Sequence, residues 1–318
     1  MAWFLKSYER LLILIPFATF ARGLLFAHQL SKVWSVESSK SNFSEIQQFR
    51  ALMRSFSSLK NNFKVEEFHG MKHQVIFNGE GSWGRAPARC EISDLLIISY
   101  RKHPTFQARA TLLQAKKSND KHSNLCSTSS NLIPSINFKA NLEQWDLLSR
   151  RPNVLPHKPF DCRPDILSGA ILPSIGSLGV FHKISSKKYD FFYMSADVAT
   201  PLSFPKYKHA KLKTKPMNSS RNTKGYFECT YASCLMSFAI SLYNLEIGTP
   251  IEPQRIVSEE DKSYRNMFRG WLKSVLYSHL EITSNESLLT RDLISQLESS
   301  YDGELMSEPP SLLIINCD

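Results

Sequence analysis

The stretch that decides the fold is a pair of apolar runs, Asp94-Leu95-Leu96-Ile97-Ile98-Ser99-Tyr100 and Arg109-Ala110-Thr111-Leu112-Leu113-Gln114-Ala115-Lys116. Residues 101–108 join them and carry Pro104 near the midpoint, which predicts a turn. Two such runs around a short turn are typical of a β-hairpin, and strands that are apolar on both faces are typical of the centre of a sheet. With the turn centred near Pro104 and Thr105, Asp94 is expected opposite residues 114–116.

This hairpin is expected to gather polar side chains at its open end. Because strand side chains alternate, Gln114 and Lys116 share one face, and Asp94 joins it from the neighbouring strand. Glu91 lies just before that strand and is close enough in sequence to reach the same point. A carboxylate, an amide or backbone oxygen and several waters suit Mg²⁺ or Mn²⁺. An ammonium group at Lys116 would orient a water and offset charge on a phosphate.

The spacing of these residues resembles that of the PD-(D/E)xK nuclease superfamily, which includes restriction endonucleases and repair nucleases. In that family an acid begins one core strand, and a hairpin leads to an acid, any residue and a lysine on the next. Here Asp94 is followed, after nineteen residues, by Gln114-Ala115-Lys116. The glutamine departs from the usual acid and is similar to the QxK variant of the Mrr-like branch, and Ser93 stands at the nominal proline.

The resemblance implies an α/β, restriction-endonuclease-like fold, in which helices flank a mixed sheet, with additional N- and C-terminal helices. It implies a Mg²⁺-dependent endonuclease in which Asp94, Gln114 and Glu91 hold the metal and Lys116 is the catalytic lysine. It also suggests a role in bacterial antiviral defence. The family often takes a further glutamate from an element before the hairpin, for which the candidates are Glu66, Glu67 and Glu80.

The charge balance favours a polyanionic partner. The chain has 318 residues, a net charge of +10 and a pI of about 9.3, and such a balance raises the expectation of nucleic acid, DNA in preference to RNA. No acidic residue lies between Asp197 and Glu228, and this segment contains the candidate nucleic-acid contacts Lys206, Lys208, Lys211, Lys213 and Lys215. A solvated loop explains the same lysines equally well. A protein partner or a homodimer is also expected from the resemblance.

Three regions are expected along the chain: an N-terminal helical region (1–59), the nuclease-like core (60–200), and a basic segment followed by C-terminal helices (201–318). Packing of the last region with the core as one domain is compatible with this division. Apolar spacing predicts helices over 1–34, 45–59, 142–148, 231–245, 263–280 and 287–299. Strands are expected over 73–77, 178–182, 189–196 and 312–315, a Ser-rich break over 35–44, and irregular chain over 117–138 and 152–173.

Other chemistries have little support in the sequence. No HExxH, GxSxG or Walker lysine occurs, which argues against a zinc protease, a serine hydrolase and a P-loop enzyme. Six cysteines without CxxC spacing predict reduced thiols in a cytoplasmic protein. The apolar run 11–21 is shorter than the roughly 20 residues that span a bilayer, so a buried or partner-facing helix is expected and a membrane partner is not.

Two alternatives to the nuclease remain open. A catalytically inactive nucleic-acid-binding or scaffold protein of the same fold would account for the missing second acid. A protein anchored to a membrane through residues 3–27 would account for the apolar N-terminus.

Overall fold

The computed structural model describes residues 2–59, 63–67, 73–79, 87–121, 135–157, 161–186, 188–203, 209–215, 221–224, 227–252, 258–283, 287–297 and 309–318. Side chains are described from residue 19 onward, except for those of 221–224. All statements about structure refer to these residues.

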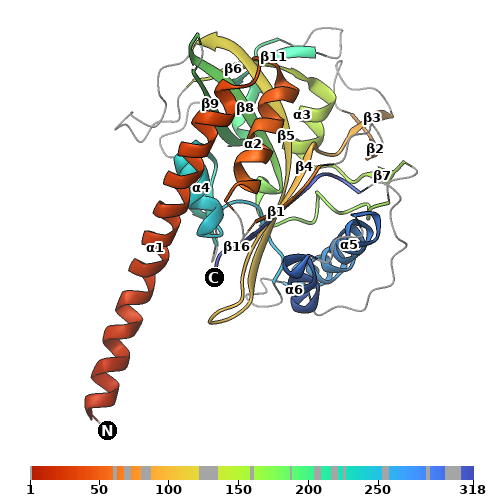
Figure 1. The fold of residues 1–318 in the computed structure, drawn as a ribbon. Coiled ribbons are helices and arrows are strands. Elements are labelled where there is room, and N and C mark those ends of the chain that lie inside the picture. The colour runs from red at the N-terminus through yellow and green to blue at the C-terminus, as the bar shows by residue number, and fades with distance from the viewer. Residues whose placement is uncertain are drawn as a thin grey trace.

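A mixed β-sheet forms the centre of the molecule (Figure 1). Its strand order is β1-β16-β4-β5-β8-β9-β14, and β15 pairs with β5. The strands are β1 (Phe63–Glu66), β4 (Leu95–Arg101), β5 (Gln107–Lys121), β8 (Gly176–Ser185), β9 (Lys188–Ser195), β14 (Ala232–Cys234), β15 (Thr249–Pro250) and β16 (Leu312–Asn316). β16 is parallel to β4 and β5 is parallel to β8, while the β4–β5 and β8–β9 pairs are antiparallel. The expected α/β class with a mixed sheet is therefore confirmed.

The register of the hairpin places Asp94 where the sequence predicted it. Leu95 is the Cα partner of Leu113, and Arg101 is the partner of Gln107. One further step along this antiparallel ladder sets Asp94 opposite Gln114. β5 continues beyond β4, and its extension pairs with β8. The end of β4 thus leaves one edge of β5 open at Gln114 and Lys116.

Helices cover both faces of the sheet (Figure 1). On one face, α1 (Ala2–Ser39), α2 (Glu45–Ser57) and α4 (Leu235–Tyr243) share a hydrophobic cluster with Leu95, Leu113 and Phe181. On the other, α3 (Leu142–Arg150), α5 (Glu259–Thr283) and α6 (Leu288–Gln296) pack with Leu96 and Leu112. Alternate residues of each central strand therefore enter different cores, which explains why both strands are apolar throughout.

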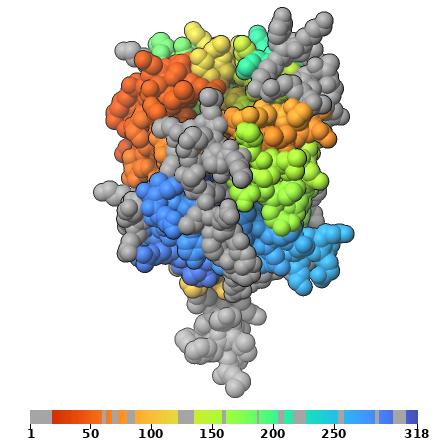
Figure 2. Space-filling view, turned by 90° about the vertical axis from the view of Figure 1, so that its right-hand side faces the viewer, coloured from red at the N-terminus to blue at the C-terminus, as the bar shows by residue number. Residues whose placement is uncertain are grey.

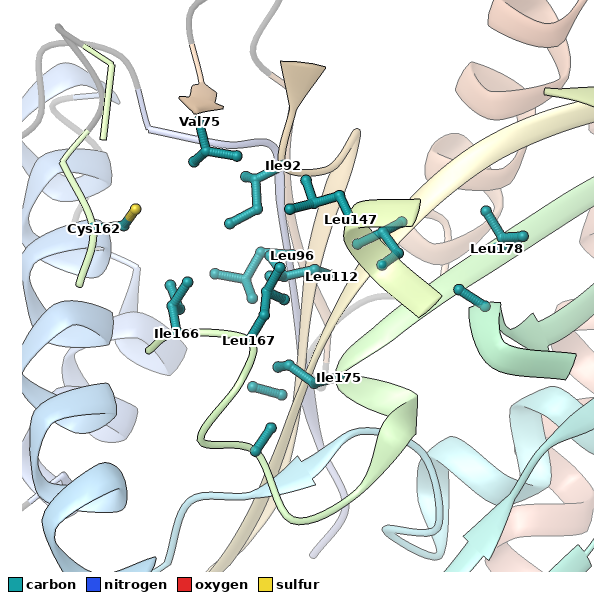
Figure 3. Packing of buried hydrophobic residues seen from close by; sticks show 14 of the residues in the cluster. Val75, Ile92, Leu96, Leu112, Leu147, Cys162, Ile166, Leu167, Ile175 and Leu178 are labelled. Carbon is teal, nitrogen blue, oxygen red and sulfur yellow. The ribbon is translucent and has the colours of Figure 1, made fainter. Parts of the chain in front are cut away.

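The core beside α5 also contains irregular chain. In Figure 3, Ile166 and Leu167 lie between α5 and the strands that carry Leu96 and Leu112. On the surface, the C-terminal helices (blue) lie below the green segment around residue 150 (Figure 2). Backbone hydrogen bonds hold this segment in place, among them Gly169 N to Asp165 O at 2.9 Å. The prolines of 152–173 thus mark a packed connection with little regular structure.

Three small sheets complete the fold. One has the order β10-β11-β6, another β3-β2-β7, and the third pairs β12 with β13. Their strands are β2 (Gln74–Phe77), β3 (Ala88–Glu91), β6 (Asn137–Asn141), β7 (Leu155–Pro156), β10 (Ala199–Pro201), β11 (His209–Thr214), β12 (Arg221–Lys224) and β13 (Phe227–Thr230), and short 3₁₀ turns occupy Pro173–Ile175 and Ala196–Val198.

Several sequence-based boundaries are corrected. The first helix extends through the start of the Ser-rich stretch to Ser39. The helix predicted from residue 231 begins at Leu235, because residues 232–234 pair with β9 as an edge strand. The lysine-rich segment after Asp197 contains β11, so the expectation of a loop is wrong there. β16 lies between β1 and β4, which brings the C-terminal region back into the core sheet.

Two further expectations concern the cysteines and the N-terminus. Cys90, Cys162, Cys229 and Cys317 are buried and carry reduced thiols, as predicted. Cys234 is disulfide-bonded, so the prediction of reduced thiols is wrong for this residue. Among the described residues, no helix has the length and apolar character needed to cross a membrane.

Candidate functional site

A cleft of about 620 Å³ opens at the end of the central hairpin. It lies where β4 has ended and β5 continues, and all four predicted site residues line it: Glu91, Asp94, Gln114 and Lys116. The other residues that line it are Ser44, Glu45, Lys117, Asn119, Lys139, Ala140, Asn141, Gln144 and His209. The cleft is therefore built from β5, the ends of β3 and β6, and the N-termini of α2 and α3.

Asp94 is held in place by the neighbouring strand. Its backbone N donates to Leu113 O at 3.0 Å, and its Oδ2 accepts from Ala115 N at 2.7 Å. The side chain of Gln114 also hydrogen-bonds to this carboxylate. The β5 backbone thus fixes the position and orientation of the carboxylate, which is what a metal ligand needs.

Gln114 brings an unused acceptor to the cleft. The residue is 3% exposed, and its Oε1 has no hydrogen-bond partner among the described residues. A buried amide oxygen without a partner costs about 1–3 kcal/mol. Such an atom is unusual in a folded protein. A bound ligand would satisfy it. The glutamine that departs from the family pattern therefore still supplies an oxygen at this point.

Lys116 lies close to all the acids of the cleft. Its Nζ is 4.0 Å from Glu45 Oε1, and its side chain is only 7% exposed. Burial raises the pKa of Asp94 and of Glu91, and the positive charge of Lys116 opposes this rise in both. Burial and the neighbouring carboxylates restrict the position of this ammonium group. Lys116 is thus placed to contact an anion that enters the cleft.

Glu45 is a site residue that the sequence reasoning missed. It is the first residue of α2, just after the N-cap Ser44, whose side chain accepts from Gln47 N. Its carboxylate accepts a hydrogen bond from the backbone of Lys117 and faces Lys116 across the cleft. The available signal was its position at the start of the predicted helix 45–59, because the resemblance implies a glutamate from an element before the hairpin.

The upstream acids proposed for this role lie elsewhere. Glu66 pairs with Lys64 at 2.9 Å and with the buried His279. Glu67 pairs with Arg50 at 3.2 Å, and Glu80 lies outside the described residues. Neither Glu66 nor Glu67 lines the cleft.

The three carboxyl groups of the cleft all have raised pKa values. Burial raises the pKa of Asp94 above its ordinary value, and Lys116 with two hydrogen bonds offsets this only in part. Burial likewise raises the pKa of Glu45 and of Glu91, and repulsion from Asp94 raises both further. Several raised carboxyl pKa values in one cleft are typical of functional sites. A bound cation would offset both the burial of these charges and the repulsion between them.

The donor atoms fit a small hard cation. Asp94, Glu45 and the orphaned Oε1 of Gln114 provide only oxygen, the element that Mg²⁺ prefers. No three His, Cys, Asp or Glu side chains of the described residues are grouped closely enough to form a ready-made metal cage. Mg²⁺ usually binds through one or two carboxylates together with waters and substrate phosphate oxygens. The residues of the cleft match that incomplete type of site.

The predicted lysine contacts lie only partly within the described residues. Lys211 and Lys213 are exposed on β11, and Lys215 follows that strand. Lys206 and Lys208 fall outside the described residues. Lys211 is the Cα partner of Lys139, which is exposed on β6 and lines the cleft. This face of the small sheet therefore carries positive charge up to the rim of the cleft.

Comparison with known proteins identifies no relative of this chain. No protein family, no curated protein sequence and no solved structure matches it.

Proposed function

We propose that this protein is a metal-dependent nuclease with a restriction-endonuclease-like core, which hydrolyses phosphodiester bonds of nucleic acid, DNA in preference to RNA. One observation carries the proposal: Asp94, Gln114, Lys116 and Glu45 meet in one cleft at the open end of the central hairpin. The first three are the residues on which the sequence resemblance rests. The fourth comes from a helix that precedes the hairpin, as the resemblance implies.

The residues divide the chemistry among them. Asp94, Glu45 and Gln114 Oε1 would hold Mg²⁺ or Mn²⁺, with Glu91 close by at the rim. A divalent ion there would polarise the phosphate and lower the pKa of a water molecule. Lys116 would orient the attacking water through its ammonium group and stabilise negative charge on the phosphate in the transition state.

The electrostatics of the cleft favour a phosphate. α2 and α3 both begin at its rim, where Ser44 and Asn141 are their N-cap residues. Helix N-termini carry partial positive charge and unpaired backbone N–H groups, which attract anions. Lys139 and Lys117 add formal charges at the same rim. The three acids lie among these positive groups, an arrangement suited to a cation bridging to a phosphate.

A second function is favoured by one specific observation. Gln114 stands where the family has an acid, so the site has one negative charge fewer than a standard member. A protein that binds nucleic acid without cutting it, as a binding or scaffold protein of the same fold, would keep the positive rim and tolerate this loss. The two functions differ in metal-dependent cleavage.

The deciding experiment incubates the full chain with DNA and with RNA in Mg²⁺, in Mn²⁺ and in EDTA. Lys116→Ala is the test variant, and Lys262→Ala is the matched control, because Lys262 is an exposed lysine on α5 whose ion pair in the described part of the chain is with the exposed Glu259. We expect cleavage that requires the metal, falls at least a hundredfold in Lys116→Ala, and is unchanged in Lys262→Ala. Equal behaviour of wild type and Lys116→Ala would leave the non-catalytic function as the better account.

A further inference from the structure

A second cationic cluster lies next to the cleft, which it shares through Lys117. Lys117 on β5 and Lys183 on β8 both place their ammonium groups over the ring of Phe43, at 5.1 and 4.8 Å from its centroid. Phe43 in turn stacks on Tyr189 of β9, with centroids 5.0 Å apart and ring planes within 3°. Four segments of the chain thus meet in one arrangement of two lysines and two aromatic rings.

The aromatic pair explains how the two lysines are held. A phenyl ring attracts a cation above its face by about 0.5–1 kcal/mol at exposed sites. Lys117 Nζ also donates to the backbone O of Phe43 at 3.5 Å. The rings therefore fix both side chains, which lowers the entropy cost of binding an anion there.

The two charges are not neutralised within the described structure. Neither ammonium group lies within 4.0 Å of a carboxylate of the described residues, although the structure contains many such pairs elsewhere. A third lysine, Lys121 on β5, is the Cα partner of Lys183. Like charges gathered around one ring repel each other, and an anion between them would remove that repulsion.

The position of the cluster relates it to the cleft. Lys117 follows Lys116 directly in β5 and lines the cleft, and its backbone hydrogen-bonds to Glu45. Phe43 directly precedes Ser44, which also lines the cleft. Successive side chains of a strand point to opposite faces, but Lys116 and Lys117 both line the cleft. An anion held by Lys117 and Lys183 would therefore lie at the edge of the cleft in which Lys116 holds a phosphate. Two neighbouring phosphates are what a polynucleotide presents and what a small phosphodiester does not.

We propose that Lys117 and Lys183, held on the Phe43–Tyr189 pair, form a subsite for a backbone phosphate of nucleic acid next to the phosphate in the cleft. This inference rests on the proposed function and specifies its substrate as a polymer. The ring of Phe43 is already in contact with Tyr189 and with two ammonium groups, so it is not available to stack on a base. The subsite is therefore expected to bind a phosphate. The binding is accordingly expected to depend on charge and salt and little on sequence.

The test measures binding separately from cleavage. A short fluorescently labelled DNA duplex is titrated with the full chain in EDTA, at several NaCl concentrations, and anisotropy gives the affinity. The variants are Lys183→Gln, which removes one charge outside the cleft lining, and Phe43→Leu, which keeps both charges but removes the ring that holds them. Lys262→Gln is the control for loss of one lysine elsewhere, and thermal melting of each variant reports on folding.

We expect Lys183→Gln to weaken binding about fivefold to tenfold at low salt. The slope of log affinity against log salt should become less steep by about 0.9, the value for one lost phosphate contact on duplex DNA. Phe43→Leu should weaken binding less and leave the slope near that of wild type, and Lys262→Gln should change neither quantity.

Wild-type affinity and slope in Lys183→Gln would overturn the subsite, as would loss of the same size in Lys262→Gln. This failure is distinguishable from failure of the proposed function, because cleavage is judged by Lys116→Ala in Mg²⁺. Binding that depends on Lys183 without any cleavage would refute the nuclease and keep the subsite. Cleavage that depends on Lys116, together with binding that is unaffected by Lys183→Gln, would support the nuclease and refute the subsite.

Discussion

Asp94→Asn is predicted to stabilise the folded protein while abolishing its response to Mg²⁺. Burial raises the pKa of Asp94 despite the charge of Lys116 and the hydrogen bonds from Ala115 and Gln114. The ionised carboxylate therefore has a higher free energy in the folded chain than in water. Asparagine has nearly the same shape, and its carbonyl oxygen can still accept from Ala115 N. The substitution therefore removes the buried charge and keeps the local geometry.

The size of the effect follows from opposing contributions. A buried ion costs several kcal/mol, and each hydrogen bond to a charged group returns about 1.5–3 kcal/mol, against about 1 kcal/mol for a neutral one. Since the pKa of Asp94 is raised, the cost of burial exceeds what its partners return. Because Asp94 keeps partial exposure at the cleft, we expect a net gain of only about 1 kcal/mol. For a chain of this size that is an increase in Tm of about 2 °C.

The gain should depend on pH in a defined direction. A carboxyl group whose pKa is raised by folding lowers stability once the pH rises above its unfolded pKa, and the full cost is reached above the folded pKa. The advantage of asparagine should thus be present at pH 8 and shrink as the pH falls through the folded pKa of Asp94, where the wild-type group becomes protonated. In acid the two proteins should melt alike.

The assay is thermal unfolding of both proteins at pH 8 and at pH 4.5, with and without Mg²⁺. At pH 8, Mg²⁺ should raise the Tm of the wild type, because a ligand that binds only the folded state stabilises it, and should leave Asp94→Asn unchanged. A variant that is less stable than wild type at pH 8, or whose advantage is the same at both pH values, would refute the reasoning.

Three further predictions concern other parts of the fold. Glu45→Gln should abolish metal-dependent cleavage yet change the Tm little, since loss of an acid in the first turn of a helix costs about 0.3–1 kcal/mol and removal of a carboxylate whose pKa is raised by burial offsets that cost; an activity assay beside a melt would show both, and wild-type cleavage would remove Glu45 from the site. His279→Gln should destabilise the protein by about 1–3 kcal/mol in urea unfolding, because it removes one of the two partners of the buried Glu66 and leaves only Lys64 beside it among the described residues. Burial raises the pKa of Glu66, but the hydrogen bonds and attraction from His279 and Lys64 outweigh burial, so the pKa of Glu66 is lowered overall. The stability that Glu66 contributes should therefore be present above its unfolded pKa and be lost as the pH falls through its folded pKa. Gly248→Ala should destabilise by more than 1 kcal/mol, because Gly248 has φ +93° and a Cβ there would lie 2.5 Å from Ala110 O; unchanged stability in urea would contradict this.

The central hairpin and its site were predictable from sequence because they depend on local rules. The two apolar runs and the turn at Pro104 determine how the strands pair. This pairing places Asp94 opposite Gln114. Strand alternation then places Lys116 with Gln114. Each step uses residues that are near one another in the chain, so no knowledge of long-range packing is needed.

The parts that were missed depend on contacts between distant segments. Glu45 reaches the site only because α2 packs on the sheet face that carries Leu113 and Ala115, which no local pattern reveals. β11 alternates buried and exposed residues, but its lysines dominated the sequence and suggested a loop. The position of β16 between β1 and β4 joins residues more than two hundred positions apart. Composition and periodicity carry little information about such pairings.

The most direct test of the account is a cleavage assay in which a single residue of the cleft and the metal are varied together. Labelled DNA is incubated with wild type, Lys116→Ala and Lys262→Ala in Mg²⁺, in Mn²⁺ and in EDTA. The account predicts that wild type and Lys262→Ala cut only with a divalent metal, and that Lys116→Ala is at least a hundredfold slower. Cleavage by wild type in EDTA, or equal rates for wild type and Lys116→Ala, would contradict it.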